Sequence, residues 1–420
     1  MVATCHHASV TADTRALSPA PVGRGSRPAP RWLTLVGIVV LALNLRPSIT
    51  SLGVSLGQVG DSFDFSGSVA GVLTTLPVLC FAVVGLATQT IGNRIGVHRT
   101  ATLSLVATTF GLLVRGLTDS TAVFFTASVL SMSGIAIANV TLPHLVKLHF
   151  PDRIAAVAGL YSALLMTGAL LPSLTSVPID QAADSWRAGL LVWAMVAGLS
   201  LLPWLALTRH EVTADLSTHG RISVRMLTRS RLAWCLALFC GLQSAMAYAQ
   251  FGWLTQIYVD AGLTRAEGSL LLGLLTAIGI PLPLLLPWLF ARVPDHRVFV
   301  TVFSGTGAAG FVGLWLAPAT TPWLWAVLMG VGGCAFPYVL TMIGLRAHTP
   351  DGVAALSAFT QSVGYLVAAI GPLLAGLLYE LTGGWDVPLV ILALLGGPML
   401  IAGLGFAREQ YVEDTLPVRG

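Results

Sequence analysis

The side chain with the clearest chemical potential is an arginine inside an apolar segment. Arg46 lies roughly 21 Å of α-helix beyond Trp32, well inside a ~30 Å hydrocarbon layer. A charge at that depth costs at least ~2.5–3.5 kcal/mol to insert, so it usually faces a cavity or a partner. Pro47 removes a backbone donor and can open the turn beside it. Two interpretations follow: Arg46 binds an anionic ligand or acts in gating, or it ties helices together through backbone carbonyls.

Uncharged polar side chains occur in other apolar runs. Asn139 lies one helical turn before Pro143 and two turns before Lys147, so the three share a helix face. Gln361 and Tyr365 share a face in the same way. Each Asn, Gln or Tyr could contact a substrate or make an interhelical hydrogen bond. Lys147 could also reach the membrane surface from an inner edge.

Acidic residues all fall at loops or span edges in this sequence, and Asp180 is expected at an outer edge. No carboxylate is therefore expected in the membrane core to form a proton relay. His144 is the other ionisable side chain expected to lie deep, either as a proton-linked switch or as a structural residue. No nucleophile–base set or metal-ligand spacing is present, so we expect no enzyme, no cofactor and no metal site.

A dinucleotide-type pattern lies in the second half of the chain. Gly305 to Gly310 fits G-x-G-x-x-G. It lies inside a hydrophobic run, without the strand–turn–helix context that nucleotide binding requires. We interpret these glycines as close helix packing.

The composition is that of an all-α membrane protein. The chain has 420 residues, of which 55% are hydrophobic and 10% charged, whereas soluble domains have about 25% charged residues. Its net charge of +4 reflects membrane topology, and we expect contact with the lipid bilayer and not with nucleic acid. About twelve transmembrane helices are predicted: 32–56, 68–90, 100–117, 121–146, 154–177, 187–208, 231–255, 267–290, 298–317, 322–345, 353–379 and 385–407.

The distribution of basic residues predicts the orientation. With a cytoplasmic N-terminus, most of the 22 Lys and Arg residues fall in cytoplasmic segments, as the positive-inside rule requires. Arg115, Arg187 and Arg265 fall at outside edges. Both termini are therefore predicted to be cytoplasmic.

The long polar segment 209–230 divides the chain into halves. We predict a disordered cytoplasmic tail (1–30), two six-helix halves (31–208 and 231–407), the cytoplasmic linker (209–230) between them, and a C-terminal cytoplasmic tail (408–420). Ser162 to Leu174 aligns with Ser362 to Leu374, which indicates an internal repeat. Repeated halves with Gly/Pro-interrupted helices are typical of secondary transporters, whose substrate site lies between the halves.

The segment Asn93-Arg94-Ile95-Gly96-Val97-His98-Arg99 resembles the signature loop of the major facilitator superfamily. The resemblance implies a gating loop on the cytoplasmic side that includes Asn93, Arg94, Gly96 and Arg99. The family's acidic position is Asn93 here and a basic position is His98, so the charge pairing departs from the family pattern.

Further motifs resemble the cyanate permease and nitroimidazole exporter family of that superfamily. They include Leu43-Asn44-Leu45-Arg46-Pro47, Asn139-Val140-Thr141-Leu142-Pro143, Gly241-Leu242-Gln243-Ser244 and Gln361-Ser362-Val363-Gly364-Tyr365. The resemblance implies two pseudo-symmetric halves, a monomer, and a central cavity. Asn44 and Arg46 are roughly 200° apart on an ideal helix and share the cavity only if Pro47 distorts it. The predicted substrate-binding residues are Asn44, Arg46, Asn139, Gln243, Tyr248, Tyr338, Gln361 and Tyr365.

Function is expected to be transport by alternating access across the inner membrane. In one hypothesis the substrate is a small anion such as cyanate or a carboxylate, held by Arg46. In the alternative, Arg46 is structural and aromatic side chains line a cavity for neutral, nitroimidazole-type compounds exported by proton antiport. The candidates for those aromatic side chains are Tyr248, Phe251, Trp253, Phe336 and Tyr338. A membrane receptor without transport is the least favoured interpretation.

Overall fold

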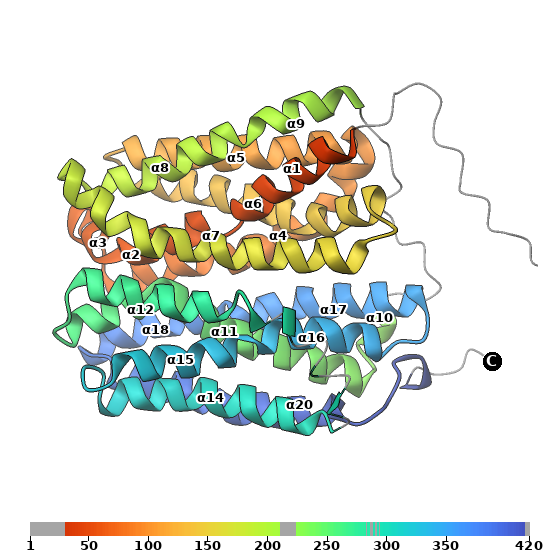
Figure 1. The fold of residues 1–420 in the computed structure, drawn as a ribbon. Coiled ribbons are helices and arrows are strands. Elements are labelled where there is room, and N and C mark those ends of the chain that lie inside the picture. The colour runs from red at the N-terminus through yellow and green to blue at the C-terminus, as the bar shows by residue number, and fades with distance from the viewer. Residues whose placement is uncertain are drawn as a thin grey trace, which may run out of the picture.

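A computed structural model describes residues 30–210 and 224–415, apart from 283, 286–288, 290, 291 and 294. Almost all of the predicted N-terminal tail and most of the predicted linker lie outside these residues. Figure 1 shows the described helices in two bundles, one above the other, with residues 31–207 in one and 224–407 in the other. We call them the N-half and the C-half.

The N-half follows the predicted spans within a few residues, with its first and sixth spans interrupted. Its helices are α1 (Arg31–Leu43), α2 (Pro47–Val54), α3 (Leu56–Phe63), α4 (Gly67–Ile95), α5 (Val97–Leu117), α6 (Thr121–His149), α7 (Ile154–Ala183), α8 (Trp186–Leu199) and α9 (Leu201–Leu207).

The C-half begins with the short α10 (Val224–Leu227). Its remaining α-helices are α11 (Arg231–Asp260), α12 (Arg265–Ile278), α14 (Arg297–Leu316), α15 (Pro322–Gly333), α16 (Ala335–Leu345), α17 (Pro350–Ala368), α18 (Ile370–Thr382), α19 (Asp386–Leu394) and α20 (Gly396–Ala407). Within the described residues, eleven helical segments are long and apolar enough to cross a membrane. The predicted span 267–290 is not among them, since it runs into undescribed positions.

The first span breaks where Pro47 predicts an opened turn. Helix α1 ends at Leu43, and Pro47 occupies the first turn of α2, where its missing N–H costs no helical hydrogen bond. The intervening residues 44–46 therefore interrupt the α-helix between Leu43 and Pro47. Arg46 lies at this break.

The loop between α4 and α5 is a tight turn. Gly96 ends α4 and precedes α5 with φ 91°, a conformation that residues with a Cβ rarely adopt. Asn93, Arg94 and Arg99 around it are exposed. The sequence predicts a gating function for these four residues, and that function stays a prediction.

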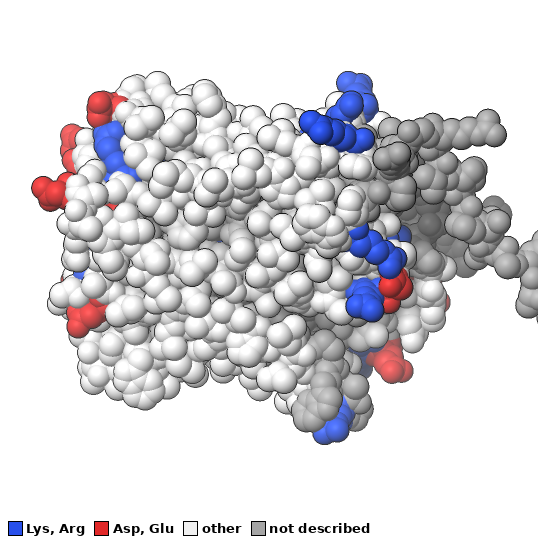
Figure 2. Space-filling model, turned by 45° about the horizontal axis from the view of Figure 1, so that its top comes forward, with Lys and Arg blue, Asp and Glu red and all other residues white. Residues whose placement is uncertain are grey.

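Charged residues separate toward the two ends of the bundles, as Figure 2 shows. The end with the α4–α5 turn carries Arg94, Arg99, Lys147 and Arg153, and we call it the positive end. The opposite end carries Asp61, Asp119, Asp184, Asp260 and Glu380, and we call it the acidic end. Between the two ends lies a belt of uncharged residues.

Two charged residues that the sequence places at outer edges are buried. Asp180 is 3% exposed, and Arg115 is completely buried. Each is near the end of a helix, but neighbouring helices cover it, and helix contacts of this kind cannot be read from the local sequence. Asp180 lies near the end of α7, where an edge position is expected, but the sequence gives no sign that it is buried.

The predicted C-terminal tail is docked through residue 415. The backbone N–H of Val412 donates to the carbonyl of Arg346 at 2.9 Å, and the hydroxyls of Thr415 and Ser230 lie 2.7 Å apart. Residues 408–415 therefore pack on the C-half at the positive end, and are not a free tail.

Candidate functional site

A cavity of about 300 Å³ lies between the two halves. Both halves contribute to its wall. Its lining extends along the parts of α6, α7, α16 and α17 that are nearest the positive end. Its lining residues with polar side chains are Arg46, Asn139, Tyr161, Ser162, Gln243, Ser244, Tyr248, Gln250, Thr276, Cys334, Ser357, Gln361 and Tyr365.

Arg46 is the one charged side chain among the described lining residues. Its Nη1 donates to the hydroxyl of Tyr248 at 2.9 Å. Its Cζ lies 5.4 Å from the ring centroid of Tyr248 and 5.3 Å from that of Phe251, within the range of cation–π attraction. In the described part of the chain, no carboxylate pairs with Arg46. Ring faces and one hydroxyl therefore surround a full positive charge that borders an open cavity.

Six of the eight predicted substrate-binding residues line this cavity: Arg46, Asn139, Gln243, Tyr248, Gln361 and Tyr365. Asn139 and Tyr365 line the cavity from opposite halves. The amide of Gln361 donates to Ser357 at 2.9 Å. The polar faces predicted for α6 and α17 thus both border this cavity.

Asn44 and Tyr338 lie outside the cavity lining. The amide of Asn44 donates to the carbonyl of Val40 at 2.7 Å and to Ser200 Oγ at 2.8 Å. Its backbone N–H still bonds back into α1, so Asn44 keeps the direction of that helix while Arg46 leaves it. The hydroxyl of Tyr338 donates to the carbonyl of His296 at 3.3 Å, and its ring packs among other aromatic rings of the C-half.

The aromatic wall differs in part from the expected one. Tyr248, Phe251 and Phe336 line the cavity. The indole of Trp253 instead donates to the carbonyl of Pro372 at 3.2 Å, inside the C-half. Trp253 is thus a packing residue in this structure.

His144 is half-buried one turn before Lys147 on α6 and is not among the cavity-lining residues. No hydrogen bond from its ring to another described residue is found. Its function as a proton-linked switch stays a prediction.

Sequence reasoning missed several lining residues, among them Tyr161, Ser162, Gln250 and Ser357. A signal for Gln250 exists in the sequence. Gln243, Ala247 and Gln250 follow the i, i+4, i+7 spacing of one helix face, so the assignment of Gln243 to the cavity could have been extended to Gln250.

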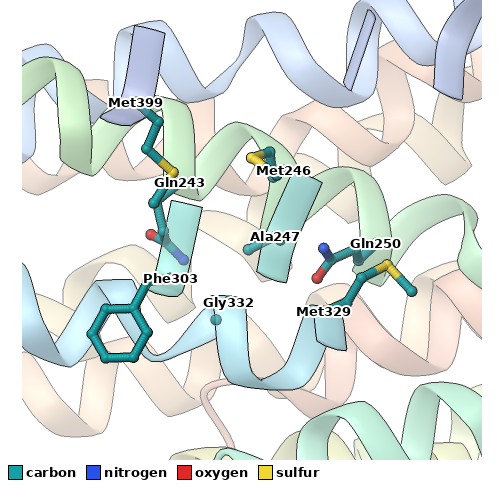
Figure 3. Close-up of a pocket in the computed structure, with 10 residues that line it drawn as sticks. Gln243, Met246, Ala247, Gln250, Phe303, Met329, Gly332 and Met399 are labelled. Carbon is teal, nitrogen blue, oxygen red and sulfur yellow. The ribbon is translucent and has the colours of Figure 1, made fainter. Parts of the chain in front are cut away.

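A second, much smaller pocket of about 10 Å³ adjoins the cavity. Gln243, Ala247 and Gln250 line both spaces. Figure 3 shows the small pocket, with Met246, Met329 and Met399 contributing to its wall. One face of α11 therefore separates the cavity from a methionine-rich pocket in the C-half.

At the acidic end the two halves are joined by polar contacts. Arg265 of α12 pairs with the buried carboxylate of Asp180 on α7, and its Nε donates to the carbonyl of Val54 at 3.0 Å. The carboxylate of Glu380 accepts from the backbone N–H of Ser68 at 2.6 Å. These contacts close the acidic end, whereas the cavity extends toward the positive end.

Comparison with known proteins identifies the family. The model of the Major Facilitator Superfamily matches residues 38–372. The 2-nitroimidazole transporter of Escherichia coli (strain K12) is 34% identical and covers 91% of this chain and 97% of its own. The cyanate transport protein CynX of the same strain is 30% identical and covers 90% of this chain and 98% of its own.

The fold agrees with that of solved transporters. A bacterial homologue of the human lysosomal transporter Spinster, in an inward-facing and unoccupied conformation, superposes with a TM-score of 0.72 at 16% identity, over 94% of this chain and 100% of that chain. The predicted all-α membrane fold and the predicted resemblance are thus confirmed. The chain transports a small solute across a membrane and is not an enzyme. This chain belongs to the major facilitator superfamily.

Proposed function

We propose that the chain carries a small anion, such as cyanate or a carboxylate, across the inner membrane by alternating access. The observation that supports this most directly is the lining position of Arg46 without a described carboxylate partner. An anion entering the cavity gains a compensating charge in a region of low dielectric, where Coulomb attraction is large. One of the relatives is named as a cyanate transport protein.

The same proposal fixes which end of the protein faces the cytoplasm. The positive end is cytoplasmic, with both termini there, because basic residues remain on that side of membranes. The cavity then opens inward, and the contacts of Arg265 and Glu380 close the outer side. The protein works as a monomer, since both halves of the cavity come from one chain.

A second candidate function is efflux of neutral, nitroimidazole-type compounds by proton antiport. The cavity wall includes five aromatic side chains, which suit uncharged ring compounds: Tyr161, Tyr248, Phe251, Phe336 and Tyr365. A relative is named as a 2-nitroimidazole transporter. In this case Arg46 only holds Tyr248 in place.

Uptake into proteoliposomes separates the two functions. The panel is cyanate, nitrate, short carboxylates and 2-nitroimidazole, with and without a pH gradient. We expect Arg46→Gln to abolish anion uptake, and Arg46→Lys to alter selectivity because it keeps the charge but loses the planar fork. The control is Arg153→Gln, since the Arg153 side chain is 76% exposed. Normal anion uptake by Arg46→Gln would contradict the charged site, and uptake of 2-nitroimidazole alone would favour efflux.

A further inference from the structure

Gln250 carries an amide that has no hydrogen-bond partner among the described residues. The residue is only 5% exposed and borders the central cavity. Neither amide atom is among the fully enclosed side-chain atoms that lack a partner, so the amide can be reached from the cavity. A group that enters the cavity can supply the missing partner.

The position of Gln250 on α11 gives it access to two spaces. It lies between the cavity and the small methionine-lined pocket, and Figure 3 shows its amide turned into that pocket region beside Met329. Methionine side chains are flexible and adapt to neighbours, so the amide has room to turn. Gln243 shares this face, but its Oε1 already accepts from Ser244 Oγ at 3.2 Å.

We propose that Gln250 is a second recognition residue of the site, and that the cargo is a ring-sized monoanion bearing an uncharged hydrogen-bonding group. The inference rests on the proposed function, in which Arg46 holds the charge. Gln250 then hydrogen-bonds to the uncharged polar group of the cargo, because an amide can both donate and accept a hydrogen bond. Discrimination through a buried hydrogen-bonding group is stronger than discrimination by shape alone.

The size of the cavity supports a cargo larger than a triatomic ion. The cavity volume is many times the ~10–15 Å³ that a single water needs by the same measure. Cyanate would fill only a small part of that volume. A ring with a carboxylate uses more of the space, and Phe251 and Phe336 on the cavity wall provide apolar contact for such a ring.

Transport measurements on matched aromatic acids test this inference. The probes are benzoate, its ring-hydroxylated derivatives, cyanate and benzyl alcohol, with uptake into proteoliposomes as the readout. For the wild type we expect at least one hydroxybenzoate to exceed benzoate in uptake efficiency by about tenfold. For Gln250→Leu we expect this preference to fall to about twofold or less. If Gln250→Leu does not fold, Gln250→Met is used in its place, because methionine has a similar length but no amide.

The control variant is Gln181→Leu, which removes an exposed amide at the acidic end and should keep the preference. An unchanged preference in Gln250→Leu and Gln250→Met would overturn the inference. So would a wild type without any preference, since water would then satisfy the amide. Arg46-dependent uptake of cyanate but of no ring anion would overturn the inference and leave the proposed function standing. Uptake of benzyl alcohol alone would overturn both.

Discussion

Arg115 and Arg46 lie in apolar helical segments but have different surroundings. Arg115 is completely buried, donates to the carbonyl of Ser48 at 3.2 Å, and has no described partner for Nε or Nη1. Arg46 borders the cavity and has a hydroxyl and two ring faces around it. Because only Arg46 can be reached from the cavity, only Arg46 can meet a solute. Arg115 is positioned to hold the broken first span against α5.

The hydroxyl of Tyr248 orients the guanidinium of Arg46. We expect Tyr248→Phe to reduce the efficiency of anion uptake by about tenfold, since a hydrogen bond to a charged group contributes about 1.5–3 kcal/mol. Initial rates over a range of anion concentrations measure this. Tyr258→Phe is the matched control, because it loses a hydroxyl bond of 3.0 Å to the carbonyl of Pro322 away from the cavity. An equal loss of uptake in both variants would contradict the orienting function.

Glu413 makes the docking of the C-terminal segment sensitive to pH. Its carboxylate accepts from the backbone N–H groups of His348 and Thr349, at 3.1 and 3.0 Å, and from the Thr349 hydroxyl at 2.9 Å. Partial burial alone would raise the pKa of Glu413, but these hydrogen bonds outweigh it and hold the pKa below its usual value. A lowered pKa in the folded state stabilises docking above the unfolded value of about 4.3.

We therefore expect residues 408–415 to be protected from hydrogen exchange at neutral pH. Protection should be lost as the pH falls through the lowered pKa of Glu413, where the carboxylate is protonated. Glu413→Gln should weaken protection at neutral pH and remove its acid dependence. Persistent protection of the wild type in acid would contradict this account.

Sequence reasoning placed Arg46 well because a charge in an apolar run has few structural solutions. It misplaced Asn44, since a helix break changes direction within a few residues. It also missed the burial of Asp180, whose partner Arg265 lies in the other half of the chain. Contacts between residues so far apart leave no local pattern.

At the scale of elements, the spans could be predicted from the sequence, and their interruptions only in part. Length and apolarity define a membrane helix, so predicted and observed bounds agree within a few residues for most spans. The breaks at Cys334 and Ala369 each lie three residues before a proline, Pro337 and Pro372. Proline lacks the N–H that would bond to the carbonyl four residues earlier, so the helix opens there. Pro143, in contrast, lies inside the unbroken α6, so a proline marks a possible break without deciding that it occurs.

Close packing of α5 on α6 depends on a glycine. A Cβ at Gly111 would lie 2.5 Å from the backbone nitrogen of Ser131 and 2.6 Å from the carbonyl oxygen of Ala127. Backbone atoms cannot move aside cheaply, so we expect Gly111→Ala to destabilise the protein by about 1–3 kcal/mol. Thermal unfolding in detergent measures this as a lower melting temperature.

Gly305→Ala is the matched control, since a Cβ there meets nothing within 4 Å. Alanine favours the helix over glycine by up to about 1 kcal/mol, so this variant should be neutral or slightly stabilised. Equal destabilisation by both substitutions would contradict the packing argument. Within the G-x-G-x-x-G pattern, a Cβ at Gly310 would lie 2.4 Å from Cγ of Met329. The predicted helix packing therefore holds at Gly310 but not at Gly305.

At the scale of the whole molecule, the described polar contacts between the halves run from the middle of the cavity to the acidic end. The hydrogen bond from Arg46 to Tyr248 bridges the halves at the cavity. Ser269 donates to the carbonyl of Ser173, and Arg265 pairs with Asp180, nearer the acidic end. Alternating access requires these contacts to break when the acidic end opens. The strength of these contacts therefore sets the balance between the state in which the acidic end is closed and the state in which it is open.

The Arg265–Asp180 pair should contribute most to that balance. Removing one partner of a buried ion pair leaves an uncompensated charge, at a cost of about 3–5 kcal/mol. That cost falls mainly on the closed state, because opening of the acidic end returns Asp180 to water. We expect Arg265→Gln to shift the population toward an open acidic end. Electron–electron distance measurements between spin labels at Asp61 and Thr382, one exposed residue on each half, should show a longer component.

Arg187→Gln separates this effect from a simple loss of charge. Arg187 also pairs with an aspartate near the acidic end, with 2.6 Å between Nη2 and Asp119 Oδ1, but both residues belong to the N-half. Its removal cannot favour one arrangement of the halves over the other, so the distance distribution should stay that of the wild type. If Arg265→Gln gives the same distribution as Arg187→Gln, the closure of the acidic end rests on the glycine-lined contact of α4 with α18 and not on the ion pair.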